Sequence, residues 1–392
     1  MAISSLLWAQ IAGLRERNEV TVLCVAGPDP GELDSVARLR ERGIEVHAAE
    51  RRNGERGRLR RAARMARGWL LLRHPWRTVW FDDPQLQVLL DGLLETRTFD
   101  LLVAEDDAMA NLELRGALPA VLTIGELGRA RGRATRGPLA ALWNLVAWID
   151  WRRWPHYQLT ASRRFTLIVV FTEADRERVS VLDRRLGDRV RVAPFGIELP
   201  PPSDPALEQE DLLLFAGEYT HPPNVDAALW LATEIMPLIR AARPAARLLL
   251  VGRNAPETVR ELGSCDGVEF IGVVPALDPL LARAACVMAP LRLGGGMRMK
   301  VLHAMACGRA VVTTELGAAG LGAPADLPLA IANDPEQLAA LTVSLLGDGA
   351  ARRDLGRRAR VFVAERHSPQ AVAARLERIY SEAVELGAGG VL

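Results

Sequence analysis

Residues 294–308 read GGGMRMKVLHAMACG, three glycines followed by a run with helical period. Lys300 lies in this run and is the only lysine of the chain, since every other cationic residue among the 49 Lys+Arg is an arginine. At about 100° per residue, Gly296, Lys300, His303 and Cys307 share one face of the predicted helix, and an apolar face suits packing on a sheet. Free amides in the first turn of a helix, together with its dipole, favour an anion. The stretch therefore predicts a sheet-packed helix with an anion bound near Lys300.

The choice of lysine at this position is itself informative. A compact ammonium on a flexible stem fits a tight phosphate site where the planar guanidinium of arginine does not. Arg298 projects about 200° from Lys300 on the helical wheel, although a residue of the first turn can reach around it. The alternative is that Lys300 is a stray lysine on a solvated helix face, and residue type alone leaves both interpretations open.

The bulk composition indicates two domains. A chain of 392 residues that is 49% hydrophobic is long enough for two separate cores. The formal net charge of +1 argues against a general nucleic-acid-binding protein, because binding a polyphosphate chain needs a basic excess. The four cysteines are scattered without metal-ligand spacing and are predicted to be reduced core residues. There is no Asp-x-Asp pair to hold a divalent ion against a diphosphate, and we expect no metal and no cofactor.

Residues 51–77 form a basic segment with ten arginines and the single acid Glu55, interleaved with tryptophans and leucines. This pattern is typical of an amphipathic helix on an anionic membrane surface, and a solvated helix face is the alternative. No apolar run is long enough to span a bilayer, and the first residues lack the charged region and apolar core of a secretion signal. The sequence therefore predicts a cytoplasmic protein, with peripheral association at the inner membrane face if the segment binds lipid.

Short apolar runs alternate with amphipathic helical segments, the pattern of parallel sheets covered on both faces. The proline-rich residues 199–205 interrupt it and predict a linker without regular structure. We therefore predict an α/β fold of two facing doubly wound, Rossmann-like domains, with residues 1–198 as the first domain and 199–367 as the second, followed by a helix and tail at residues 368–392. The cleft between the domains is the expected site. The predicted strands are 19–25, 44–49, 101–104, 121–124, 167–171, 190–193, 212–216, 247–251, 268–271, 286–289, 310–313 and 329–331.

The first domain begins unusually. Residues 2–15 have the pattern of an amphipathic helix that leads into the strand at 19–25, whereas a doubly wound domain normally opens on a strand followed by a glycine-rich turn. We expect that the first strand is missing and that Met1 is not the natural start.

Several motifs resemble the donor domain of family 4 retaining glycosyltransferases, which have the GT-B architecture of two Rossmann-like domains. The similarity covers nearly the whole chain and is strongest from about residue 211 to the end. The motifs are Phe215-Ala216-Gly217, Pro222-Pro223-Asn224-Val225-Asp226, Val251-Gly252-Arg253-Asn254, Phe270-Ile271-Gly272 and the run from Gly294 to Gly308.

The resemblance implies transfer of a sugar from a nucleotide diphosphate sugar to a glycan, lipid or small-molecule acceptor, with retained anomeric configuration and without a metal. It implies that Lys300 and Arg298 offset the charge of the diphosphate, with Arg253 as a further cation beside Asn254. The main chain near Val273 would hold the base. The glycine loop and first turn would face the donor sugar and diphosphate through Gly295, Gly296 and Met297.

The chain departs from the family pattern at sites that matter for catalysis. His303 stands where the family has a glutamate that accepts both ribose hydroxyls, and an imidazole offers at most one acceptor. Gly295 replaces an acidic residue, and Gly125 stands where the first domain commonly has a histidine near the sugar. A degenerate family member that binds without catalysis is therefore an alternative, and a nucleotide-sugar epimerase is a weaker one.

Overall fold

The computed structural model describes residues 10–27, 30–50, 55–71, 74–114, 118–125, 140–202, 204–294 and 298–388. It divides into two compact units, of which unit 1 holds residues 1–194 with 373–392 and unit 2 holds residues 195–372. The predicted helix at residues 2–15 is described only from residue 10, and residues 10–14 are helical. All twelve predicted strands are present, with ends shifted by up to three residues. The predicted α/β class is therefore confirmed.

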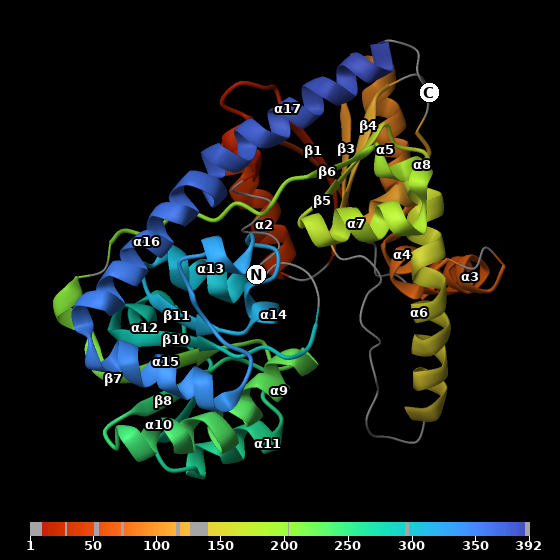
Figure 1. The fold of residues 1–392 in the computed structure, drawn as a ribbon. Helices are drawn as coiled ribbons and strands as arrows, with labels where there is room; N and C mark the ends of the chain where they lie inside the picture. The colour runs from red at the N-terminus through yellow and green to blue at the C-terminus, as the bar shows by residue number, and fades with distance from the viewer. Residues whose placement is uncertain are drawn as a thin grey trace. The chain divides into compact units, whose positions relative to one another are not determined.

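The described part of unit 2 contains a six-stranded sheet in the order β12-β11-β10-β7-β8-β9, with every neighbouring pair parallel. Both faces of the middle strands are buried, because helices cover each face of the sheet (Figure 1). The strands are β7 (Gln209–Ala216), β8 (Arg247–Val251), β9 (Val268–Gly272), β10 (Ala284–Ala289), β11 (Ala310–Thr313) and β12 (Ala330–Ile331).

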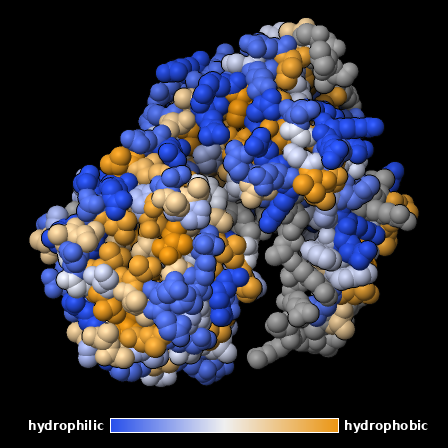
Figure 2. Space-filling view, viewed as in Figure 1, coloured by the Kyte–Doolittle hydropathy of each residue, from blue (hydrophilic) through white to orange (hydrophobic). Residues whose placement is uncertain are grey.

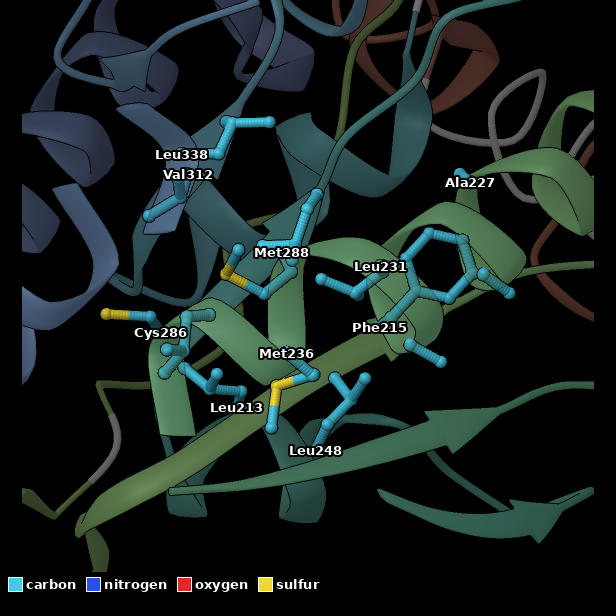
Figure 3. Packing of buried hydrophobic residues seen from close by; sticks show 14 of the residues in the cluster. Leu213, Phe215, Ala227, Leu231, Met236, Leu248, Cys286, Met288, Val312 and Leu338 are labelled. Carbon is cyan, nitrogen blue, oxygen red and sulfur yellow. The ribbon is translucent and has the colours of Figure 1, made fainter. Parts of the chain in front are cut away.

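Alternate residues of these strands enter two separate cores. On one face Leu213, Phe215, Leu248 and Met288 pack against helices that contribute Leu231, Met236 and Leu338 (Figure 3). On the other face the intervening strand residues pack against the apolar side of the helix that carries Lys300. Because successive side chains of a strand point to opposite faces, the sheet has one core on each face, and each core is covered by its own helices.

The helices of unit 2 connect the strands in sequence. The predicted linker is wrong at its end, because Pro205 opens a short 3-10 turn that Asp204 caps by accepting a hydrogen bond from the Ala206 amide. The elements are η2 (Pro205–Leu207), α9 (Pro222–Trp230), the π-helical η3 (Leu231–Ile235), α10 (Met236–Ala242), α11 (Glu257–Arg260), η4 (Glu261–Ser264), α12 (Asp278–Arg283), α13 (Met299–Ala306), α14 (Glu315–Ala318), η5 (Pro324–Asp326), α15 (Pro335–Gly347) and α16 (Gly349–His367).

The strands of unit 1 are parallel but fall into two hydrogen-bonded sheets, β1-β2 and β3-β4-β5-β6. The residues of β4 and β5 are fully buried, whereas β1 and β3 are mostly half-buried. Among the described residues no hydrogen-bonded pairing joins the two sheets, since β1 and β3 each pair on one side only. The strands are β1 (Thr21–Ala26), β2 (Glu45–Glu50), β3 (Leu102–Glu105), β4 (Ala120–Ile124), β5 (Leu167–Val170) and β6 (Val190–Val192).

The C-terminal helix belongs to unit 1 from Ala373 onwards. Arg191 pairs with Glu382 on this helix, and Arg17 pairs with Glu377. The helices of unit 1 are α2 (Pro30–Glu41), α3 (Glu55–Leu70), α4 (Trp76–Phe81), α5 (Pro84–Thr96), η1 (Asp107–Asn111), α6 (Ala140–Ser162), α7 (Glu173–Leu182), α8 (Arg184–Gly187) and α17 (Pro369–Ala388).

A buried ionic cluster supports the amino end of the unit 2 sheet. The carboxylate of Glu208 accepts hydrogen bonds from Arg352 at 2.6 Å and Arg309 at 3.2 Å, and the three side chains are at most 9% exposed. The guanidinium of Arg352 also donates to the carbonyl of Leu345 at the end of α15. One carboxylate therefore joins α16 to the segments that lead into β7 and β11.

Replacing Glu208 by glutamine tests this cluster. The change leaves two guanidinium groups buried without their counter-charge, and we expect a loss of about 3–5 kcal/mol in the free energy of unfolding by urea. Asp354→Asn is the control because its ion pairs with Arg357 and Arg358 are solvent-exposed and contribute far less to stability. Equal losses in the two variants would contradict a special role for the buried cluster.

Candidate functional site

The carboxyl ends of the unit 2 strands form the edge at which the candidate site lies. The chain crosses from β9 at one edge of the sheet to β10 beside β7, so the topological switch falls between β7 and β10. Ligands of open parallel sheets bind at such a switch, because the connections diverge there and leave a crevice. The segment after β10 leads to α13, and the segment after β7 leads to α9.

Lys300 on α13 reaches across this switch. Its ammonium donates a hydrogen bond to Oδ1 of Asn224 in the first turn of α9, at 2.6 Å. The Nζ atom also lies 4.4 Å from the centroid of the Phe215 ring on β7, which gives a cation–π contact. Burial, and then repulsion from Arg298, lower the pKa of Lys300 to about 7. Both contacts of the ammonium, with Asn224 and with Phe215, are to neutral groups, so neither offsets its charge toward an anion.

Arg298 immediately precedes α13 and is oriented differently. Its Nε donates to the carbonyl of Leu316 on α14, at 3.2 Å. The predicted separation of the two cations on the helical wheel agrees with these different partners, although their charges still interact. Arg298 therefore contributes positive charge to the start of α13 while it anchors the neighbouring helix.

Glu218, directly after β7, was not identified from the sequence. Its carboxylate accepts hydrogen bonds from Arg253 at 2.6 Å and from Asn254 at 2.9 Å. Partial burial raises the pKa of Glu218, but these hydrogen bonds, first from Asn254 and then from Arg253, outweigh it and lower the pKa to about 2. Arg253 is thus ion-paired, and the structure shows part of its charge offset by Glu218.

The turn after β8 brings these residues together and requires glycine. Gly252 has a φ of +149°, and a Cβ there would lie 1.7 Å from the carbonyl oxygen of Gly217. Asn254 adopts a left-handed φ of +57°, which aims its amide at Glu218. Asn224 completes the arrangement by donating to the carbonyl of Glu218 at 2.8 Å. A chain of contacts therefore runs from Lys300 through Asn224 to the turns after β7 and β8.

His303 lies one turn after Lys300 and has a carboxylate partner. Its Nε2 is 2.9 Å from Oδ1 of Asp278, the first residue of α12. The Asp278 side chain is 55% exposed and that of His303 is 31% exposed. The carboxylate that the family resemblance places at position 303 is absent there, and Asp278 supplies one beside it.

The remaining predicted residues are placed as follows. Val273 follows β9 and is 69% exposed, and Gly125 follows β4 in unit 1. Gly295, Gly296 and Met297 lie outside the described residues. The sequence reasoning missed Glu218 and Asp278, and it quoted Asn224 only as part of a motif. A polar residue directly after a buried strand was the available signal for Glu218, but no sequence signal pairs Asp278 with His303.

Comparison with known proteins finds a match within unit 2. Residues 210–348 match the model of the family described as glycosyl transferases group 1. The GDP-mannose-dependent monoacylated alpha-(1-6)-phosphatidylinositol monomannoside mannosyltransferase of Corynebacterium glutamicum is 33% identical over 156 residues. That match covers 37% of this chain and 41% of the relative, which is less than half of the relative's length.

Solved structures with low sequence identity share the fold. The Anabaena HepE structure in complex with UDP is 14% identical, covers 97% of this chain and 96% of its own, and gives a TM-score of 0.63. Sucrose-phosphate synthase from Thermosynechococcus elongatus is 18% identical, covers 76% of this chain and 77% of its own, and gives a TM-score of 0.54. These similarities confirm the predicted GT-B fold.

The low pKa of Lys300 predicts a pH-dependent stability. The pKa of Lys300 is about 7 in the folded protein and 10.5 in the unfolded chain. Between these two pH values the unfolded chain binds more protons than the folded protein, so the free energy of unfolding rises with pH. Lys300→Met removes this dependence. We expect the stability of the variant relative to the wild type to fall by up to about 1.4 kcal/mol per pH unit between pH 8 and 10.

Urea unfolding of both proteins at several pH values measures this difference. Arg260→Met is the matched control, because it makes the same kind of change at an exposed cation on α11. Groups that titrate equally in both proteins cancel. If the difference in the free energy of unfolding between Lys300→Met and the wild type stays constant with pH, burial of the Lys300 ammonium does not destabilise the folded protein.

Proposed function

We propose that this protein is a glycosyltransferase that transfers a sugar from a nucleotide diphosphate sugar to an acceptor, with retention and without a metal at the diphosphate. The observation that carries the proposal is the Lys300 ammonium, held on the neutral side chain of Asn224 at the switch between β7 and β10. The match of residues 210–348 to the group 1 family supports it.

The proposed chemistry uses the charge at this edge. When the sugar bond breaks, negative charge develops on the leaving diphosphate, and a cation already in place stabilises the transition state more than the bound donor. Lys300 would supply that charge, with Arg298 and the amides at Gly295, Gly296 and Met297 adding to it. Arg253, Asn254 and His303 would line the donor site, and the main chain near Val273 would hold the base. An anion beside Lys300 favours the charged form, so donor binding would take up a proton.

The donor class is supported by what the similar proteins bind. Structures of Anabaena HepE contain UDP or UDP-glucose, and the Corynebacterium relative is named as GDP-mannose-dependent. A nucleoside diphosphate is common to these donors. The relative's name includes a phosphatidylinositol mannoside, which favours a lipid-linked acceptor over a small molecule.

A second candidate is a degenerate protein that binds a nucleotide diphosphate without transferring sugar. Arg253 is engaged by Glu218, and His303 occupies the family's glutamate position. Gly125 provides no side chain, although a Cβ there would make an ordinary contact with the Phe171 ring at 3.5 Å. These observations weaken catalysis more than anion binding.

A membrane surface is the proposed second partner. The end of α3 is fixed to α6, because Asp150 accepts a hydrogen bond from the Trp69 indole at 2.7 Å and Arg153 donates to the Trp69 carbonyl. We name the exposed residues around this junction the α3–α6 surface. Hydrophobic and hydrophilic side chains lie close together there, at the right of Figure 2. The exposed apolar members are Leu70, Leu71, Trp76, Trp80, Leu145, Trp148 and Trp151.

Exposed cations accompany these side chains. Arg152 lies over the Trp148 ring at 5.3 Å, and Arg67 is exposed near the end of α3. Tryptophan with arginine suits the interface of an anionic bilayer. No helix among the described residues is long and apolar enough to cross a membrane. The basic segment predicted at 51–77 is described only in part, and α6 adds tryptophans that the sequence analysis did not include.

Calorimetry with UDP and GDP tests the donor site. We expect binding of at least one of them at pH 8 with uptake of up to one proton, seen as a dependence of the heat on the buffer's ionisation enthalpy. Lys300→Met is expected to lower the affinity at least tenfold and to abolish the proton uptake, since one buried charge-assisted contact is worth about 1.5–3 kcal/mol. Arg260→Met is the control for a cation away from the switch.

The same proteins separate the two candidate functions. Release of sugar from a bound nucleotide sugar supports the transferase. Binding without turnover, also in Gly125→His and His303→Glu, supports the degenerate protein. Absence of nucleotide binding in well-folded wild-type protein would overturn both.

Vesicle flotation tests the α3–α6 surface. We expect binding to vesicles with anionic phospholipid, weaker binding at high salt, and little binding to neutral vesicles, because screening removes the arginine contribution. The double change Trp148→Ser and Trp151→Ser should reduce binding several-fold. Val181→Ser serves as the control, because Val181 on α7 is 84% exposed but lies outside the surface. Equal loss in the control would contradict a localised docking surface.

A further inference from the structure

Three potential metal ligands converge between α12 and α13. Oxygen, nitrogen and sulfur atoms of Asp278, His303 and Cys307 all lie within 4.8 Å of one another. The His303 Nε2 and Asp278 Oδ1 atoms are already 2.9 Å apart. In the described part of the chain, these residues form the one group of three such side chains that meets this distance.

The fold makes the convergence possible. His303 and Cys307 are four residues apart, so they lie one above the other on the same face of α13 and its final turn. Asp278 is the first residue of α12. The spacing of the four cysteines shows no metal-ligand pattern, because the partners of Cys307 in this cluster are a histidine and an aspartate.

The three side chains differ in exposure in a way that suits a metal ion. Cys307 is buried at 4% exposure, whereas His303 and Asp278 are partly exposed. The sulfur therefore faces protein, and the carboxylate and imidazole face the solvent. A tetrahedral ion held by these three groups keeps one position for water.

The charges at the cluster also favour a dication. Burial, and then the neighbouring Asp278 carboxylate, raise the pKa of the Cys307 thiol to about 12, and Arg309 and Arg360 oppose this. Both arginines have other partners, since Arg309 donates to Glu208 and Arg360 donates to the carbonyl of Pro200. A thiolate and a carboxylate around a divalent ion give a neutral site, which removes the repulsion between them.

We propose that Asp278, His303 and Cys307 bind one zinc ion that joins α12 to α13. Thiolate, imidazole and carboxylate are the ligand types that zinc takes in proteins. The ion is distinct from the proposed contact of Lys300 with the diphosphate, but it uses His303, which is also proposed to line the donor site. Its function is to fix the orientation of α13, the helix that carries Lys300.

Binding changes the protonation of the cluster in a defined way. Zinc would bind to Nε2 of the neutral imidazole of His303, whose one proton is then on Nδ1, and to a carboxylate oxygen of Asp278. The thiol of Cys307 releases one proton to solvent as the sulfur–zinc bond forms. The apparent affinity should therefore rise about tenfold from pH 7 to pH 8.

Titration of chelator-treated, full-length protein with Co²⁺ at pH 8 tests the site. We expect one equivalent to bind, with a sulfur-to-cobalt charge-transfer band in the near ultraviolet, and Zn²⁺ to displace it. Cys307→Ala should abolish the band, and Cys265→Ala, a half-buried cysteine outside the cluster, should keep it. His303→Gln and Asp278→Asn should lower the affinity for Co²⁺ at least tenfold.

The outcomes are decisive in either direction. No band in the wild type, or a band that survives in Cys307→Ala, overturns the proposal and leaves an ordinary ion pair between Asp278 and His303. If Cys307→Ala fails to fold, the two partly exposed ligand variants decide the question. Zn²⁺ should also raise the melting temperature of the wild type but not of Asp278→Asn. Nucleotide calorimetry on the same chelator-treated protein keeps a failure of the metal site distinct from a failure of the donor site.

Discussion

Burial of the Lys300 ammonium at the switch between β7 and β10 is the constraint on which the ligand edge of unit 2 depends. An ammonium taken out of water needs hydrogen bonds, and a neutral amide from Asn224 provides one while the ring of Phe215 provides a favourable face. Asn224 can do this only because its own amide is fixed to the carbonyl of Glu218. The loop after β7 is thus shaped by the requirements of one side chain on α13.

The choice of neutral partners has a chemical consequence. A carboxylate at position 224 would stabilise the ammonium more, but it would cancel the charge that an anion needs. Arg298 lies close enough to lower the pKa of Lys300, so two cations already interact before any ligand arrives. Arg253 is different, because the Glu218 carboxylate accepts its hydrogen bond and offsets part of its charge. Lys300 is therefore the cation that is held by neutral partners.

The sequence predicted the elements better than their contacts. Buried parallel strands are apolar on both faces, and this is why runs such as those of β7, β8 and β10 could be located to within a few residues. The contacts of Lys300, Arg253 and His303 depend on which strand lies beside which, and local periodicity carries no information on strand order. Asn224 is 76 residues from Lys300 in the chain, so only the sheet order brings them together. The division of the unit 1 strands into two sheets has the same origin.

His303 illustrates how the two candidate roles of one residue compete. As an isolated side chain, an imidazole is a poor replacement for a carboxylate that accepts two hydroxyls. With Asp278 at 2.9 Å, the pair again presents a carboxylate oxygen at this place, now from α12. An ion at this cluster would take the Nε2 lone pair of His303 and one lone pair of the Asp278 oxygen that faces it. His303 would then serve structure, and donor recognition here would fall to Lys300, the main chain and the remaining lone pairs of Asp278, whereas an ion-free cluster leaves the Asp278 carboxylate to His303 and to a hydroxyl. The position of a single carboxylate thus decides whether this part of α13 serves stability or substrate recognition.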